Sequence, residues 1–195
     1  MKSITTKLLF AGTLISLPFL AAAIETLPNQ EIQQARSLVK SFGSDLKQVL
    51  KTAMQTEGPL KALEVCNVQA KPIADKNSSV SPWKIGRTSL RVRNENNIAD
   101  EWETSVLQQF EKRKKAGEDL KNMEYSEVIK SGDKSVYRYM KPIPTAGLCL
   151  TCHGTKLSND VHDKVKALYP EDKAISFNVG DIRGAFTLIK TLNVE

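Results

Sequence analysis

The residues best suited to chemistry are Cys149, Cys152 and His153, which belong to a Cys-x-x-Cys-His pentapeptide in the C-terminal quarter of the chain. Two thiols at this spacing can each form a thioether with one vinyl group of a haem. The histidine that follows is then held beneath the ring, with an imidazole nitrogen directed at the iron. The motif therefore predicts one covalently attached haem c per chain, with His153 as an iron ligand.

Two other kinds of site use the same cysteine spacing. A Cys-x-x-Cys pair is half of a tetrahedral zinc site. Because the chain has three cysteines and two histidines, Cys66 and either His153 or His162 would have to complete it. The pair is also compatible with a redox-active dithiol or a disulfide. Such a short disulfide would add little stability, and no thioredoxin-like sequence surrounds it.

The N-terminus favours haem over zinc. Lys2 and Lys7 precede or flank an apolar run over residues 8–22, and three alanines before Ile24 supply a cleavage site. This pattern predicts a secretory signal peptide over residues 1–23, too short in its apolar part to span a bilayer comfortably. An uncleaved anchor is the alternative. Covalent haem attachment in bacteria takes place outside the cytoplasm, so we expect a periplasmic protein.

Composition limits the remaining classes. Removing residues 1–23 takes away two of the 28 basic residues and none of the 22 acidic ones, which leaves 172 residues with a net charge of 26 − 22 = +4. That length is typical of one domain with a genuine core, here residues 24–195. The mild, evenly spread charge argues against nucleic-acid or membrane binding. No other apolar stretch is suited to cross a bilayer after signal cleavage.

Helical spacing of apolar residues dominates the first half of the chain. A long amphipathic helix is predicted from Asn29 to about Thr56, followed by a shorter one from Leu60 to Ala70 that ends before Pro72. Asp100 and Glu103 form a capping box for a third helix that ends at Gly117. A short polar helix is predicted over residues 160–168.

Alternating residues predict strands in the second half. Residues 125–129 and 135–140 form a predicted β-hairpin around a Ser-Gly-Asp turn, and residues 83–87 are predicted to be extended. A closing hairpin is predicted from residues 175–179 and 185–192. There Asp181 and Arg183 are expected to form an ion pair in the turn. Helices first and antiparallel strands second predict an α+β fold, with the helices packed on one side of a sheet.

Several blocks of residues form an ordered set of motifs along the chain: 86–94, Asn97, Trp102, Glu103, Leu107, Phe110, 139–143, 149–154, 169–174 and 180–185. In the order of these motifs the chain resembles a family of exported single-haem c-type proteins and sensor modules with a PAS-like fold, first characterised in cyanobacteria. The resemblance covers most of residues 24–195, although Glu95 replaces a frequent proline and Ser176 a frequent glycine.

The resemblance implies six-coordinate iron, with His153 on one side and a cysteine thiolate from an early helix on the other. The matching position is Cys66, which lies on the predicted apolar face of its helix and is the thiol left over after haem attachment. A buried, inert cysteine is the alternative interpretation. Met140 and His162 are rival ligands, although a core residue and a solvated surface residue are the simpler interpretations of these two.

Arginines near Trp83 supply charges that suit haem propionates. Arg87 and Arg93 are the first candidates for such pairs. The alternative is that they lie on a solvated edge strand.

A Cys/His iron has a low reduction potential and no open position for oxygen or peroxide. We therefore expect no enzyme. A redox or small-gas sensor is expected first, and a low-potential electron-transfer cytochrome c second. Either function needs a separate periplasmic redox or signalling partner.

Overall fold

The computed structural model describes residues 21–132 and 134–192, so the predicted signal peptide lies almost wholly outside the described residues. Four antiparallel strands form one sheet in the order β1-β4-β3-β2. The strands are β1 (Trp83–Thr88), β2 (Tyr125–Ser131), β3 (Lys134–Pro144) and β4 (Ile182–Leu192). The helices are α1 (Ala21–Thr56), α2 (Pro59–Ser79), α3 (Glu101–Lys115), α4 (Leu150–His153) and α5 (Asn159–Leu168). The predicted PAS-like α+β fold with an antiparallel sheet is confirmed.

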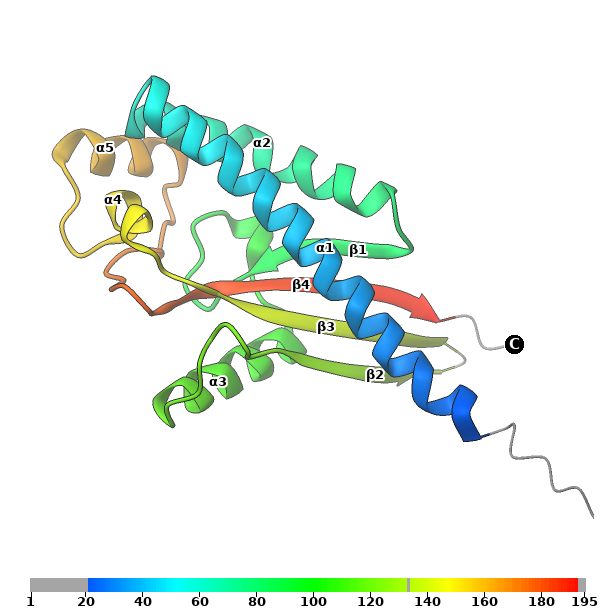
Figure 1. Cartoon of the computed structure of the whole chain (residues 1–195). Helices are drawn as coiled ribbons and strands as arrows, with labels where there is room; N and C mark the ends of the chain where they lie inside the picture. Colours follow the sequence, from blue (N-terminus) through cyan, green and yellow to red (C-terminus); the bar gives the residue numbers. More distant parts are fainter. Residues whose placement is uncertain (1–20, 133, 193–195) are drawn as a thin grey trace, which may run out of the picture.

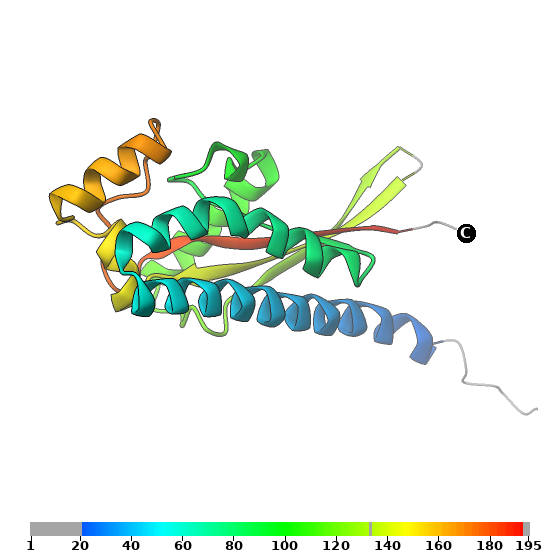
Figure 2. The same ribbon diagram turned by 90° about the horizontal axis from the view of Figure 1, so that it is seen from above.

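The long N-terminal helix covers one face of the sheet, as predicted (Figure 1). Ala35, Val39 and Phe42 of α1 pack against Trp83 and Tyr139 on the strands. These helical residues recur at steps of three and four, so they share one face of α1. Alternate residues of a strand point to opposite faces, and the next residue along β3, Met140, accordingly packs on the other side, with Phe110 of α3 among its neighbours. Helices α1 and α3 therefore lie on opposite sides of the sheet (Figure 2), so the prediction that the helices pack on one side is wrong for α3.

Helix α2 is longer than the sequence predicts. It continues through Pro72 to Ser79, although a proline inside a helix removes a backbone hydrogen bond. Ile73 and Ala74 beyond the proline pack against the α1 core, and the Asn77 amide donates to Asp45 Oδ2 at 3.1 Å. Tertiary packing thus outweighs the local stop signal, and α2 extends to the edge strand β1.

The predicted closing hairpin is wrong. Residues 175–179 form no strand, and β4 pairs instead with β1 and β3. The third-helix capping box, the β2–β3 hairpin and the helix now called α5 are confirmed. Among the described residues, no helix is long and apolar enough to cross a membrane.

The antiparallel order brings three chain segments to one end of the sheet. The end of β1 pairs with the start of β4, through Thr88 and Ala185, and the end of β3 pairs with the same start, through Pro144 and Ile182. Helices α4 and α5 follow directly and lie at this end, beside the turn between α1 and α2 (Figure 1). We call this the α4–α5 end of the molecule.

Gly184 at the start of β4 allows the close approach of β1. A Cβ atom at this position would lie 2.4 Å from the backbone oxygen of Thr88, which is too close for any side chain. We predict that Gly184→Ala lowers the free energy of unfolding by about 2 kcal/mol or more, measured by urea denaturation, because backbone must shift.

Gly86→Ala in β1 is the matched control. Its Cβ would meet only Thr187 Cγ2, at 3.8 Å, which is an ordinary contact. Stability should stay the same or rise by up to about 1 kcal/mol, since the unfolded chain loses freedom. Equal stability of the two variants would show that the β1–β4 contact does not require glycine.

Candidate haem site at the end of the sheet

The Cys-x-x-Cys-His motif forms a single tight turn at the α4–α5 end. A 3-10 helix over Gly147–Cys149 leads into α4, Leu150–His153. Gly154 ends the turn, and a Cβ atom there would lie 2.6 Å from Leu150 O. Cys149 and Cys152 are both free thiols that are partly accessible. One helical turn therefore carries the two thiols and the imidazole close together.

The imidazole of His153 is in the state that a metal ligand needs. Its Nδ1 lies 2.7 Å from the backbone oxygen of Ala174. Because a carbonyl only accepts, Nδ1 carries the proton and Nε2 keeps its lone pair. Burial, with Arg183 and Arg93 nearby, lowers the pKa of His153 to about 2. The ring is therefore neutral at physiological pH, with Nε2 as the available donor.

The segment that was predicted to be a strand serves instead as a support for this turn. Phe177 N donates to His153 O at 2.9 Å, and Ser176 N donates to Gly154 O at 3.0 Å. The Phe177 ring meets the His153 ring edge-on, with the centroids 6.2 Å apart. Hydrogen bonds to α4 thus occupy the backbone groups that a β-hairpin would have used.

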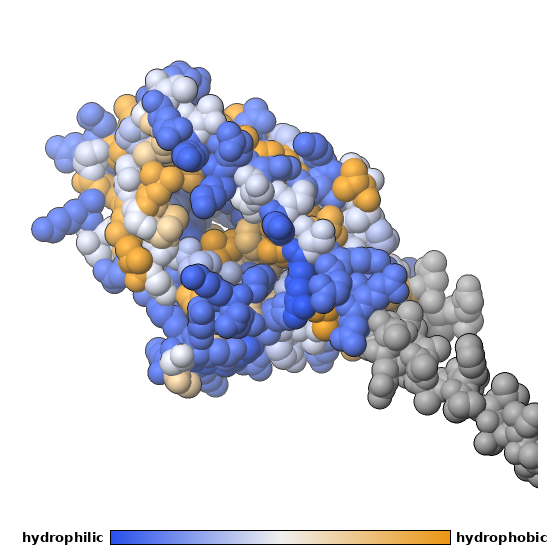
Figure 3. Space-filling model, in the orientation of Figure 1, coloured by the Kyte–Doolittle hydropathy of each residue, from blue (hydrophilic) through white to orange (hydrophobic). Residues whose placement is uncertain are grey.

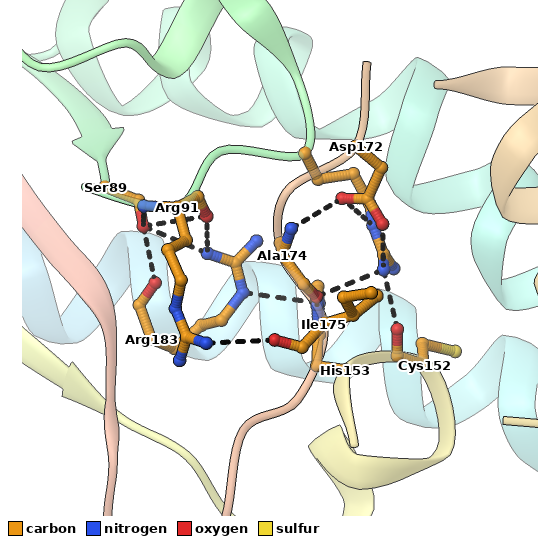
Figure 4. Close-up of polar contacts among 9 residues, drawn as sticks. Ser89, Arg91, Cys152, His153, Asp172, Ala174, Ile175 and Arg183 are labelled. Carbon is orange, nitrogen blue, oxygen red and sulfur yellow. Dashed lines mark hydrogen bonds and ion pairs between the residues drawn. The ribbon is translucent and has the colours of Figure 1, made fainter. Parts of the chain in front are cut away.

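Arg93 ties the supporting segment to the motif, and Figure 4 labels the three residues that it binds, Asp172, Ala174 and Cys152. It forms a bidentate pair with Asp172, with both side chains less than a tenth exposed. The same guanidinium donates to Cys152 O at 2.6 Å and to Ala174 O at 3.3 Å. Arg93 is therefore already paired with a carboxylate through Nε and Nη2, and its predicted pairing with a propionate stays a prediction.

Cys66 lies near the motif, on the α2 side. Leu63, one turn earlier in α2, packs against α5 and Cys152. Cys66 itself is exposed, so the interpretation of an inert core cysteine does not hold. Surrounding protein desolvates the thiol and raises its pKa, against the lowering effect of Arg87 and Arg93. Desolvation raises the pKa of Cys152, Arg93 lowers it and Cys66 raises it, so the two thiols lie close enough to interact electrostatically.

Arg87 at the end of β1 also points to this region. Burial lowers its pKa, and the charges of Cys66 and Tyr169 act in the opposite direction. Among the described residues, no carboxylate forms an ion pair with Arg87, so its charge is available to an anionic ligand. Of the two predicted propionate partners, Arg87 is the one that the protein leaves without a competing carboxylate.

The rival iron ligands lie elsewhere. Met140 is fully buried with Met123 and Phe110 in the core under α3, and His162 is exposed on α5, where it contacts Asp163. The predicted Asp181–Arg183 ion pair is wrong, because Asp181 pairs with Lys114 at 2.9 Å and Arg183 turns toward His153.

Several residues of the site were not assigned a role from the sequence. Asp172, Ala174 and Phe177 act through backbone and side-chain contacts to the motif, and Tyr169 lies beside Cys66 and Arg93. Residues 169–174 did stand out as a block of the resemblance, which was the available signal. Their function depends on a loop path that no periodicity predicts.

Apolar side chains also remain exposed in the segments that meet here. Leu60 at the start of α2, Leu148 in the motif and Ile175 in the supporting segment are each about 40% exposed. Figure 3 shows apolar patches among hydrophilic residues at the α4–α5 end. The end of the molecule thus combines thiols, a ligand-ready imidazole, unpaired arginine charge and uncovered apolar surface.

Comparison with known proteins decides the family. The model of the Tll0287-like family, described as Tll0287, matches residues 24–190. The chain belongs to the Tll0287-like family. A solved structure titled as that of the cyanobacterial heme-protein Tll0287 is similar in fold, with a TM-score of 0.59 and 22% sequence identity over 82% of this chain and 93% of that chain. A search of curated proteins found no significant match.

The Arg93–Asp172 pair should be essential for the stability of this Tll0287-like chain. We predict that Arg93→Leu lowers the free energy of unfolding by about 3 kcal/mol or more, because Asp172 is left buried without a partner. The double variant Arg93→Leu, Asp172→Leu should lose clearly less than the sum of the single variants in urea denaturation. Lys71→Met, which breaks an exposed helical pair with Asp75, is the control and should cost less than about 1 kcal/mol. Additive losses at Arg93 and Asp172 would contradict the pairing.

Ser176 occupies a backbone conformation that suits glycine. Its φ of 61° is the one positive value among the described non-glycine residues, and the sequence resemblance has glycine at this place. We predict that Ser176→Gly raises the free energy of unfolding by about 1 kcal/mol, since the left-handed region strains an L-residue by that amount. Ser158→Gly, with an ordinary φ of −65°, is the control and should give no gain. A loss of stability at Ser176→Gly would refute the strain argument.

Proposed function

We propose that this chain is a periplasmic c-type haem protein, with one haem attached through Cys149 and Cys152 and its iron between His153 and Cys66. The observation that carries the proposal is the convergence of the third cysteine, from a helix more than 80 residues earlier in the chain, on the Cys-x-x-Cys-His turn. The membership of the Tll0287-like family and the heme-protein title of the similar structure support it.

The donor set fits this group. Two accessible thiols on one helical turn match the vinyl spacing. The neutral imidazole presents Nε2, and Cys66 supplies a sulfur from the α2 side. Arg87 offers unpaired positive charge for a propionate, while the exposed apolar side chains at the α4–α5 end suit contact with the porphyrin edge. When bound, such a haem supplies a one-electron redox centre, with a potential lowered by thiolate ligation.

The two proposed ligands are held unequally. Nδ1 of His153 is hydrogen-bonded to Ala174 O, its backbone oxygen accepts from Phe177 N, and its ring contacts that of Phe177. Cys66 is exposed, and among the described residues no hydrogen bond reaches its sulfur. The chain therefore fixes one side of the site and leaves the other free to dissociate.

This inequality favours a sensor over an electron carrier. A sensor needs a ligand that leaves on reduction or when a small gas binds, whereas a carrier is served best by two rigid ligands with little reorganisation. The proposed module therefore senses redox state or a small ligand and passes the signal to a separate periplasmic partner. A low-potential electron-transfer cytochrome c is the second candidate, favoured by the exposed apolar side chains at the α4–α5 end, where a redox partner would dock. We propose no enzymatic activity.

Ligation and lability can be tested together by spectroscopy. We predict that the oxidised protein shows the absorption and electron-paramagnetic signature of low-spin haem with a thiolate ligand, and that Cys66→Ala loses it while keeping the haem. Carbon monoxide should bind both to the reduced wild-type protein and to reduced Cys66→Ala, because the Cys66 sulfur leaves the iron of the wild-type protein on reduction. Met140→Leu and His162→Gln are the controls for the rival ligands and should retain the wild-type spectra.

Other outcomes separate the alternatives. A thiolate signature that persists unchanged on reduction, without carbon monoxide binding, would contradict the sensor and favour the electron carrier. Spectra of Cys66→Ala identical to those of wild type would refute Cys66 as a ligand. If metal analysis finds zinc in place of iron, the proposed haem function is refuted and the motif belongs to a zinc site.

A further inference from the structure

Arg183 lies against the nitrogen of His153 that the proposed function assigns to iron. Its Nε is 3.5 Å from His153 Nε2, on the far side of the ring from the Nδ1 contact with Ala174 O. Figure 4 shows the Arg183 side chain next to the His153 ring, between that ring and Ser89. The protein thus places a cation where a metal ligand presents its lone pair.

The guanidinium is anchored by groups other than the histidine. The Nη1 atom of the guanidinium donates to Ser89 Oγ at 3.3 Å and to Arg91 O at 3.2 Å. The backbone oxygen of Arg183 accepts from the same Ser89 hydroxyl at 2.8 Å. The neighbouring Gly184 has no side chain, which allows the start of β4 to lie close to the backbone of Thr88. These contacts hold the guanidinium independently of its contact with His153.

The charge of Arg183 is not cancelled by the protein. Asp181, two residues earlier, is paired with Lys114, and Asp172 is paired with Arg93. Among the described residues, no carboxylate forms an ion pair with Arg183. A full positive charge therefore lies beside the His153 side of the site, in a partly buried setting where screening by water is weak.

We propose that Arg183 is a positioning residue for His153. In the haem-free chain it caps Nε2 and, with Ala174 O, fixes the plane and tautomer of the imidazole. With haem bound, the positive charge of Arg183, which Ser89 and Arg91 O hold near His153, would raise the reduction potential, because a nearby cation favours the less positive ferrous state. The second part of this inference rests on the proposed function, whereas the first concerns the polypeptide alone.

The contact between Arg183 and His153 Nε2 can be tested directly in the haem-free protein. Diethyl pyrocarbonate modifies neutral imidazole nitrogens, and His162, which is exposed, serves as an internal reference on the same chain. Modification of His153 relative to His162 is followed by mass spectrometry of peptides. Arg183→Ala should accelerate the reaction of His153 severalfold. An unchanged ratio of His153 to His162 modification would show that Arg183 does not shield His153 Nε2, and would overturn this part of the proposal.

The loaded protein tests the charge. Arg183→Ala should shift the midpoint potential downward. Arg183→Lys keeps the positive charge, so its midpoint potential should lie between those of Arg183→Ala and wild type. The lysine variant also serves as the test if the alanine variant folds poorly. Lys130→Ala is the matched control, since it removes one exposed positive charge at the opposite end of the sheet. A shift at Arg183→Ala no larger than at Lys130→Ala would overturn the electrostatic role. Failure of the chain to bind haem would refute the proposed function, while the reagent experiment would still decide the cap.

Discussion

The guanidinium of Arg93 joins three segments that are distant in the sequence, and the geometry of the site depends on it. Arg93 binds the Asp172 carboxylate and the backbone oxygens of Cys152 and Ala174. The same Ala174 oxygen orients His153. Burying a charged pair carries a large desolvation cost, which is offset only when the partners are bidentate and their remaining donors are satisfied. The pair here is bidentate, and the same guanidinium donates to two backbone oxygens, so the motif and its supporting segment are fixed together.

The sheet topology explains why these segments meet. Because β4 lies between β1 and β3, its first residues lie beside the last residues of both neighbours. Arg87 at the end of β1, Arg183 at the start of β4 and the turn that follows β3 therefore share one end of the sheet. Helix α2 starts at the same end, after the turn that follows α1, and carries Cys66 near the motif.

Much of this organisation was accessible from the sequence. The pentapeptide predicted the position of the thiols and imidazole, the helical periodicity predicted α1 and α3, and the resemblance pointed to Cys66. Local patterns failed where tertiary contacts decide the conformation. Pro72 did not end α2, because Ile73 and Asn77 are held by packing and hydrogen bonds beyond it. Residues 175–179 alternate like a strand, but their backbone supports the motif instead. Arg183 was assigned to the wrong partner, since nothing in the sequence around it shows that β4 starts beside the Cys-x-x-Cys-His motif.

The most direct test of the central claim is the intact mass of the exported protein after acid–acetone extraction. The protein would be produced with the bacterial machinery for haem attachment. We predict that the colour stays with the polypeptide, that its mass exceeds that of the bare chain by one haem, and that replacing both Cys149 and Cys152 by serine abolishes the added mass. Complete loss of colour, with the mass of the bare polypeptide, would contradict covalent attachment at this motif.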